Sequence, residues 1–228
     1  KKKDNSDQFQ LAKNLLKQYN TNKQYCTANA TFKLKTAKYL KNLVYDPKYK
    51  NEVAGEVYLN GFTYQNGEII FNIDIDSKDV SKGDKDEVDI IMSLYNFHTH
   101  PKNAYKIFNC ELGWPSADDF STYLYGLIKF DTIFHFISTM EGVYVISINK
   151  EMVPKVSKWT STYYEKEVEP WIISNLNVDK LNYRKNDGIY HSNHNIIDEE
   201  SYVKCINNIK FKGDVIFNVV FLNWDDIL

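Results

Sequence analysis

The chain has 228 residues, 43% of them hydrophobic and 25% charged, which is the balance of a globular protein with a sizeable core. Its 28 basic and 30 acidic side chains give a net charge of −2, so no basic surface for nucleic acid is expected. No apolar run approaches the roughly 18 residues of a membrane span, and three widely spaced cysteines favour a reducing, intracellular compartment, most simply the cytoplasm.

Two helical patterns precede two strand patterns in the first part of the chain. Residues 7–20 and Ala37–Val44 place apolar side chains three and four positions apart, which predicts two helices. Val53–Leu59 and Glu68–Ile75 have the short apolar runs of strands, and Asn66-Gly67 between them is a strong hairpin signal. We therefore expect two helices followed by a β-hairpin.

Strands and one helix alternate in the middle of the chain. Asp76–Glu87 is dense in polar and charged residues and predicts a solvated loop. Ile90–His98 then predicts a buried strand, and an apolar stripe at helical spacing predicts a helix that begins at Ser116. Thr132–Ser138 and Val143–Asn149 predict two strands joined by a tight turn, which form a second hairpin.

The C-terminal part of the chain combines helical patterns with one strand. Val156–Leu176 has a helical pattern as far as a break at Pro170, and Asp198–Ile209 predicts a further helix. Residues 177–197 are polar and predict an irregular segment. Val215–Leu222 predicts a final strand.

The most specific pattern in the sequence is a histidine pair in His98-Thr99-His100-Pro101. Five histidines in 228 residues would produce only about 0.1 His-x-His pair by chance. Side chains two residues apart on an extended segment point to the same side, so both rings can present a nitrogen to one ion. Imidazole nitrogens are common zinc ligands, and a catalytic zinc site needs a third protein ligand and an open position.

A carboxylate in the next predicted helix is the best candidate for the third ligand. Asp119 lies in Ser116-Ala117-Asp118-Asp119, one turn into this helix, and Trp114-Pro115 just before it indicates a chain reversal. The same Ser-x-x-Asp also fits a capping box, and Asp118 is the neighbouring alternative ligand. Asp119 can serve as cap and as ligand if its side chain turns away from its own backbone.

Together these patterns resemble the signature of the JAB/MPN (JAMM) metalloproteases. In that family an upstream Glu-x-x-Gly, a strand that ends in His-x-His-Pro and a Ser-x-x-Asp at a helix start follow one another. Glu52-Val53-Ala54-Gly55, His98-Thr99-His100-Pro101 and Ser116-Ala117-Asp118-Asp119 match the three parts in this order. The resemblance covers about residues 37–150 and includes the strand pair around Met140-Glu141-Gly142.

The resemblance implies an α/β fold of the α+β class, in which a mixed β-sheet of the JAB/MPN type is flanked by helices. We expect the metalloprotease core to occupy residues 37–152, after an N-terminal helical extension over residues 1–36. Residues 153–228 are expected to form an extension of helices and strands that packs on this core. The resemblance implies no particular oligomeric state.

The resemblance also implies roles for five residues. His98, His100 and Asp119 would bind Zn²⁺ together with a water molecule. Glu52 would be the general base that takes a proton from this water and passes it to the leaving amine. Ser116 would donate a hydrogen bond to the developing oxyanion. The implied activity is hydrolysis of peptide or isopeptide bonds, as in a deubiquitinase, with ubiquitin or a ubiquitin-like modifier as the protein substrate.

The spacing between the second histidine and the aspartate departs from the family pattern. Eighteen residues separate His100 from Asp119, about eight more than is usual, and the additional ones fall within Lys102–Leu112. A longer loop costs little closure entropy, so the ligands are expected to be preserved, whereas substrate specificity does not carry over. Cys110 and Glu111 lie close enough in sequence to assist the site or to interfere with it. The longer spacing is similar to that of JAB-domain proteins of large DNA viruses, which would act in the host cytoplasm or the virion.

Other polar residues allow competing assignments. Glu56 is a rival general base, because residue alternation places it on the same face of the strand as Glu52. His135 lies between two phenylalanines and is expected to be a core histidine rather than a ligand. A second candidate metal cluster is expected to consist only of surface side chains: Asp187, His191 and His194.

Two other functions compete with the peptidase hypothesis. A non-catalytic MPN-type scaffold that binds partner proteins would share the fold, but the intact ligand set argues against it. A zinc deaminase would carry His-x-Glu and Pro-Cys-x-x-Cys patterns, which this sequence lacks. The sequence therefore favours a zinc-dependent peptidase.

Overall fold

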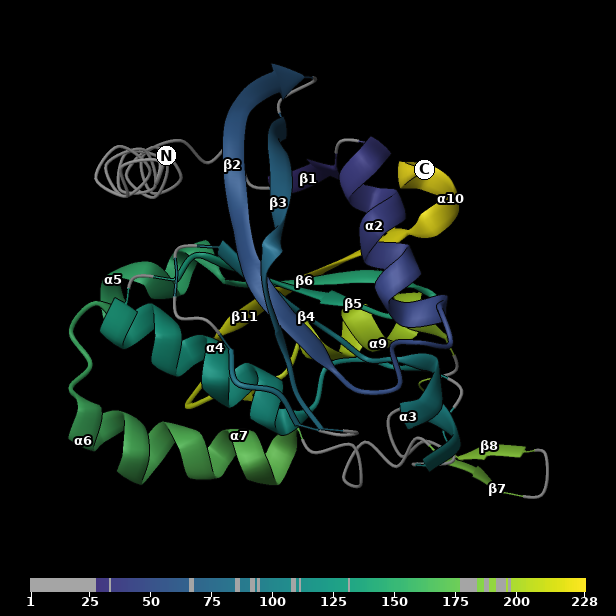
Figure 1. Cartoon of the computed structure of the whole chain (residues 1–228). Helices are drawn as coiled ribbons and strands as arrows, with labels where there is room; N and C mark the ends of the chain where they lie inside the picture. Colours follow the sequence, from purple (N-terminus) through teal and green to yellow (C-terminus); the bar gives the residue numbers. More distant parts are fainter. Residues whose placement is uncertain are drawn as a thin grey trace.

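A mixed seven-stranded β-sheet forms the centre of the molecule (Figure 1). Its strands in spatial order are β1 (Ala28–Phe32), β3 (Glu68–Lys82), β2 (Val53–Gln65), β4 (Tyr95–Thr99), β5 (Phe134–Ser138), β6 (Gly142–Ile148) and β11 (Phe217–Asn223). The β1–β3 and β4–β5 pairs are parallel, and the other pairs are antiparallel. With helices on both sides of this sheet, the predicted α+β class is confirmed. This computed structural model describes residues 28–32, 34–65, 68–84, 87–90, 93, 95–107, 110, 112–130, 132–176, 184–186, 189–191, 196 and 198–228.

Residue alternation along the strands divides the core into two hydrophobic clusters. In β6, Tyr144 and Ile146 belong to one cluster, whereas Val143 and Val145 belong to the other, as expected for side chains on opposite faces of a sheet. Helix α2 (Leu34–Tyr45) packs on the second cluster, and it confirms the helix predicted over 37–44. The helix predicted over residues 7–20 lies outside the described residues.

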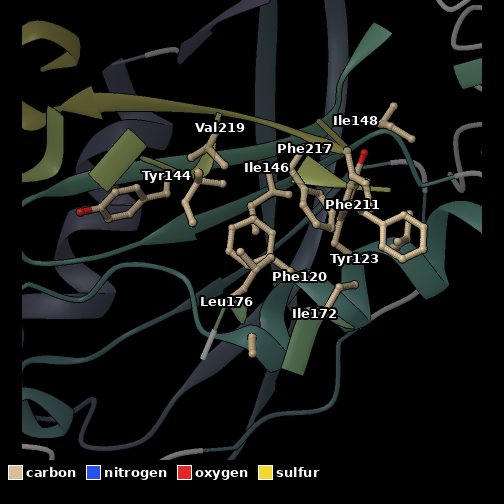
Figure 2. Close-up of a cluster of buried hydrophobic side chains, with 14 of the residues drawn as sticks. Phe120, Tyr123, Tyr144, Ile146, Ile148, Ile172, Leu176, Phe211, Phe217 and Val219 are labelled. Carbon is tan, nitrogen blue, oxygen red and sulfur yellow. The ribbon is translucent and has the colours of Figure 1, made fainter. Parts of the chain in front are cut away.

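The first cluster is covered by helices from the second half of the chain. Figure 2 shows how rings from three strands and a helix fill it, and Phe120 and Phe217 are tilted against each other at 4.7 Å between ring centroids. The helices that contribute to this cluster are α4 (Ala117–Phe130), α5 (Val153–Val156), α7 (Glu169–Asn175) and α9 (Glu199–Ile206). The helix predicted to begin at Ser116 is thereby confirmed as α4.

The long hairpin of β2 and β3 extends well beyond the other strands (Figure 1). The prediction of a solvated loop over residues 76–87 is wrong for its first half, because β3 continues to Lys82 and pairs with the start of β2. Strand pairing uses backbone groups only, so a polar segment can complete a ladder without an apolar pattern. The pairing is irregular between Gly55 and Val57, where the register shifts.

The strand that carries the histidine pair is short and central. β4 begins at Tyr95 and ends at Thr99. The strand predicted from Ile90 therefore starts five residues too early. All five of its residues are buried between β2 and β5. Parallel pairing with β5 requires a crossover connection, and α3 (Lys102–Ile107) and α4 lie within it. The hairpin predicted for the next two strands is confirmed as β5 and β6.

The segment around Pro170 does not break the helix as predicted. Helix α6 (Ser161–Tyr163) leads into a π-helical turn, η2 (Tyr164–Val168), and α7 then continues through the proline. Proline has no N–H to donate, and its ring needs room in the preceding turn. The backbone N–H of Glu169 donates to the Tyr164 carbonyl five residues earlier, and this wider turn supplies that room.

The end of the chain returns to the sheet through short elements. The helix predicted over 198–209 is confirmed as α9, which ends at Ile206. A capping box of Asp198 and Ser201 stabilises its N-terminus. The predicted last strand is confirmed as β11, which pairs with β6. The smaller elements are η1 (Lys150–Met152), β7 (Arg184–Asn186), β8 (Ile189–His191), β9 (Lys210–Phe211), β10 (Asp214–Val215) and α10 (Trp224–Ile227). The β7–β8 hairpin lies within the segment predicted to be irregular. Within the described residues, no helix has the length and apolarity needed to cross a membrane.

Candidate metal centre

The histidine pair lies at the end of β4, on the face of the sheet that α4 covers. Tyr95 and Phe97 of this strand belong to the cluster on the α2 face, so the alternating residues Asn96 and His98 point the other way. His98 is buried, with 2% of its side chain exposed. His100 follows the strand, and its backbone N–H donates to the Ser138 carbonyl at 2.9 Å.

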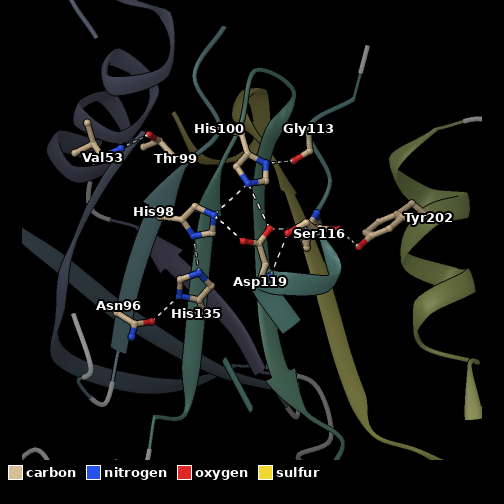
Figure 3. A network of polar contacts seen from close by, with 11 residues as sticks. Val53, Asn96, His98, Thr99, His100, Gly113, Ser116, Asp119, His135 and Tyr202 are labelled. Carbon is tan, nitrogen blue, oxygen red and sulfur yellow. Dashed lines mark hydrogen bonds and ion pairs between the residues drawn. The ribbon is translucent and has the colours of Figure 1, made fainter. Parts of the chain in front are cut away.

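Asp119 completes a group of three with these histidines (Figure 3). Its Oδ1 lies 3.1 Å from His98 Nε2, and its Oδ2 lies 3.4 Å from His100 Nε2. The two Nε2 atoms are 3.1 Å apart. In the part of the chain that the structure describes, this is the one cluster of three or more His, Cys, Asp or Glu side chains that could share an ion. The structure therefore brings together the three residues predicted as ligands.

The capping interpretation of Ser116 and Asp119 holds at the same time. The Ser116 N–H donates to Asp119 Oδ2 at 2.7 Å, and the Asp119 N–H donates to Ser116 Oγ at 3.2 Å. These reciprocal bonds are the capping box of α4. Asp119 Oδ1 remains directed at His98, so the carboxylate does both without turning away from its backbone. Asp118, the alternative ligand, is exposed.

Hydrogen bonds orient both imidazole rings so that Nε2 faces the carboxylate. His100 Nδ1 lies 2.7 Å from the Gly113 carbonyl, which can only accept, so Nδ1 carries the hydrogen. His135 Nδ1 likewise lies 2.6 Å from Asn96 Oδ1, which leaves His135 Nε2 to accept from His98 Nδ1 at 2.7 Å. When His98 and His100 are neutral, the lone pair of each ring then lies on Nε2. Such outer partners are typical of metal-binding histidines.

The charges in the group favour a cation beside Asp119. Burial raises the pKa of Asp119, but the two imidazoles, His98 first, hold it well below its usual value. Burial lowers the pKa of His100, but the hydrogen bond and charge of Asp119, the charge of Glu52 and the Gly113 carbonyl together raise it to about 9. Burial and the charge of His98 hold the pKa of His135 well below its usual value, so this ring stays neutral.

The donor set fits a divalent metal ion such as zinc. Two imidazole nitrogens and one carboxylate oxygen are ligands of the kind that three-ligand catalytic zinc sites use. When both rings are neutral, as ligands must be, their two Nε2 lone pairs and the carboxylate oxygen repel one another at separations near 3 Å unless a positive charge lies among them. The geometry and the electrostatics of the group therefore agree with the ligand assignment.

Strand pairing separates the two candidate bases that alternation alone left equivalent. Ala54 lies opposite His98 and Glu56 lies opposite Asn96, so continuing this antiparallel register places Glu52 level with His100. Four residues of extended chain span about 13 Å, which separates Glu52, just before β2, from Glu56 within it. Glu52 is buried, its charge acts on His100, and its backbone is held by hydrogen bonds with Asp84 and Gly83. Glu52 is the glutamate on the metal-group side.

The residues inserted between His100 and Asp119 fold back onto the β5–β6 turn. Part of them forms α3, whose Tyr105 is buried and donates from its hydroxyl to Glu141 Oε2 at 2.6 Å. The segment then reaches Gly113, whose carbonyl accepts from His100. With this segment in place, His98, His100 and Asp119 still lie together, and the residue that follows the segment contacts His100.

Cys110 is not part of the ligand group, and its thiol is poorly ionised. Burial, with the charge of Glu141, raises its pKa to about 11. At pH 7 the thiolate fraction is therefore about 10⁻⁴, so alkylation by iodoacetamide should accelerate about tenfold per pH unit up to pH 10. Peptide mass mapping, which separates Cys110 from the other cysteines, checks this rate. A rate that is already constant between pH 7 and 8 would contradict it. Glu111 lies outside the described residues.

Sequence reasoning missed the outer partners of the two histidines. His135 was expected to be a core histidine, and it is buried with both ring nitrogens bonded, but one of its bonds is to His98, a predicted ligand. The signal that could have identified it is its place in β5, next to β4, where it lies opposite Asn96. The side chains of the second candidate cluster, Asp187, His191 and His194, lie outside those described.

Two comparisons with known proteins found no relative of the chain. No protein-family model matches the chain, and no curated protein matches it either. The functional assignment therefore depends on the geometry of the site and on the residue patterns.

Proposed function

We propose that the chain is a zinc-dependent peptidase or isopeptidase that uses the group of His98, His100 and Asp119. The convergence of these three side chains, with both imidazole Nε2 atoms turned to the carboxylate, is the observation that carries the proposal. Three protein ligands leave one position of a tetrahedral zinc open, as catalytic sites require. The order of the motifs, which resembles the JAMM signature, selects peptide-bond hydrolysis among zinc reactions.

The two remaining predicted site residues supply proton transfer and oxyanion stabilisation. When bound, zinc would lower the pKa of a water ligand and polarise the scissile carbonyl as a Lewis acid. Glu52, buried and level with His100, would take the proton from the attacking water and deliver it to the leaving amine. Such proton transfer contributes about 10²- to 10⁴-fold to a rate.

Ser116 lies at the right end of α4 to stabilise the developing charge. Its Oγ accepts the Asp119 N–H, which leaves the hydroxyl hydrogen free to donate. A single oxyanion donor is worth about 3 kcal/mol in other hydrolases. The hydroxyl would therefore donate to the oxyanion while Ser116 continues to cap α4.

The substrate that we propose is a protein with a peptide or isopeptide linkage, such as a ubiquitin chain. The test is incubation of the purified chain with ubiquitin dimers of every linkage and with ubiquitin-like fusions, before and after removal of zinc by 1,10-phenanthroline. Cleavage that stops with the chelator and returns with added zinc is the expected result. Cleavage that is insensitive to the chelator would contradict the metal mechanism. A zinc-binding chain that cuts no panel member would remove ubiquitin as substrate, and a chain without zinc or cleavage would favour a binding scaffold.

A further inference from the structure

The Glu141 carboxylate in the β5–β6 turn accepts hydrogen bonds from three residues. Glu141 Oε2 accepts from the Tyr105 hydroxyl at 2.6 Å. Glu141 Oε1 accepts from the Gly113 backbone N–H at 2.6 Å and from the Tyr144 hydroxyl at 3.1 Å. Tyr105 lies within the inserted segment and Gly113 directly follows it, whereas Tyr144 belongs to the core. Glu141 therefore joins the inserted segment, and the residue that follows it, to the β5–β6 turn.

The peptide group of Gly113 connects this carboxylate to a proposed zinc ligand. Its N–H donates to Glu141, and its carbonyl accepts from His100 Nδ1 at 2.7 Å. Adjacent hydrogen bonds of this kind polarise one another in a low-dielectric interior. The chain from Glu141 through Gly113 to His100 is thus continuous.

Packing leaves little freedom in this connection. A Cβ at Gly113 would lie 2.2 Å from the Tyr105 hydroxyl oxygen, so a side chain at this position would displace the tyrosine. The same hydroxyl accepts from the Met140 N–H at 3.0 Å, which holds α3 against the turn itself. Gly113 therefore packs directly against the Tyr105 ring, and neither residue can move without the other.

The turn that carries Glu141 is fixed from the opposite side. The Trp224 indole N–H donates to the Thr139 carbonyl at 2.9 Å, and the Thr139 hydroxyl donates to the Gly142 carbonyl at 2.8 Å. A Cβ at Gly142 would lie 2.3 Å from the Leu222 carbonyl oxygen of β11, so this strand lies tightly against the turn. The carboxylate is consequently presented from a rigid platform.

We propose that Glu141 is a positioning residue of the metal centre, which holds Gly113 so that its carbonyl orients His100 for metal binding. This inference rests on the proposed zinc site, but it does not depend on the substrate. Removal of an outer partner of a zinc ligand typically weakens metal binding by 10- to 100-fold. The hydrogen bonds of Glu141 go to Tyr105, Gly113 and Tyr144 and not to the metal group itself, so its effect is transmitted through Gly113.

Glutamine is the informative replacement at this position. A carboxylate can accept on both oxygens, whereas a glutamine side chain has one accepting oxygen and a donating NH₂ group. In Glu141→Gln, either Tyr105 or Gly113 therefore faces a donor instead of an acceptor. Tyr144→Phe is the matched control, because it removes a hydrogen bond to the same carboxylate without touching the inserted segment.

The test compares the zinc affinities of these variants by competition with a chromophoric chelator. We expect Glu141→Gln to bind zinc about 10- to 100-fold more weakly than the wild type, and Tyr144→Phe to bind it as the wild type does. Tyr105→Phe, which loses its bonds to Glu141 and Met140, should weaken binding as well, and it carries the test if Glu141→Gln does not fold. Equal zinc affinities for the wild type, Glu141→Gln and Tyr105→Phe would overturn the inference, and so would an equal loss in Tyr144→Phe.

A second measurement tests, without any metal, whether the hydrogen bonds of Glu141 hold Tyr105 and Gly113 in place. Hydrogen exchange over residues 102–113 should accelerate in Glu141→Gln and stay unchanged in Tyr144→Phe. Unchanged exchange in Glu141→Gln would overturn the inference, because the carboxylate would then not hold the segment. A wild-type chain that binds no zinc would instead overturn the proposed function and, with it, the positioning role of Glu141. Failure of the inference is thus distinguishable from failure of the function.

Discussion

The Glu52→Gln variant is expected to keep its zinc and to lose about 10²- to 10⁴-fold in peptidase rate. Glutamine preserves the size of the side chain and leaves the backbone bonds to Asp84 and Gly83 in place, so the local fold should survive. It cannot accept a proton as a carboxylate does, and proton transfer from the attacking water is then lost. Turnover of a substrate that the wild type cleaves, together with the zinc content of the variant, measures both parts of this expectation.

Glu56→Gln is the matched control for this variant, because Glu56 lies on the same strand but opposite Asn96. Its turnover should stay near that of the wild type. If Glu56→Gln loses the activity and Glu52→Gln keeps it, the assignment of the base is wrong. Loss of zinc from Glu52→Gln would show instead that Glu52 supports the metal group and does not act only as a base.

The Asp119→Asn variant is expected to bind zinc about 100- to 1000-fold more weakly. Zinc-binding free energies of about 10–16 kcal/mol are shared among the ligands, so the loss of one charged ligand removes roughly 3–4 kcal/mol. Asparagine retains a side-chain oxygen for the Ser116 N–H, so the cap of α4 is preserved and the loss reports the ligand. Chelator competition measures the affinity, and thermal unfolding of the metal-free chains checks that the fold is intact.

Asp118→Asn provides the comparison within the same turn of α4. Asp118 is exposed and lies outside the ligand group, so this variant should bind zinc as the wild type does. A loss of affinity in Asp118→Asn equal to that in Asp119→Asn would mean that only the general acidity of this helix end matters. The pair therefore separates a ligand from a nearby charge.

Local apolar patterns predicted helix α4 and the β5–β6 hairpin. Helix α4 has one packed face, which imposes the period of 3.6 residues, whereas β5 and β6 are buried on both faces and therefore stand out as short continuous apolar runs on either side of a turn. Residues 76–82 of β3 are polar, and their strand is set by pairing with β2, which no local pattern reveals. Pro170 was predicted to end a helix, but the π-helical turn before it depends on the whole helix and its packing. In both segments, contacts with other parts of the fold, and not the local sequence, set the backbone conformation.

The ligand group was predictable because its parts follow from local geometry. His98 and His100 share a side of an extended segment, and Asp119 lies at a recognisable helix start. The choice between Glu52 and Glu56 needed the register of β2 against β4, which depends on the order of strands in the sheet. The outer partners His135, Gly113 and Glu141 come from a neighbouring strand, the residue after the insertion and a turn. Sequence spacing carries no information about such contacts until the topology is known.

The metal content and the metal coordination of the purified chain report directly on the proposed zinc site. We expect one zinc ion per chain, which is lost in the His98→Ala/His100→Ala double variant. X-ray absorption at the zinc edge should show only nitrogen and oxygen ligands at about 2.0–2.1 Å, with the multiple-scattering features of two imidazoles. A zinc site at His98, His100 and Asp119 would be ruled out by a chain that retains no zinc when supplied with it, by a double variant that keeps its zinc, or by a sulfur ligand at about 2.3 Å.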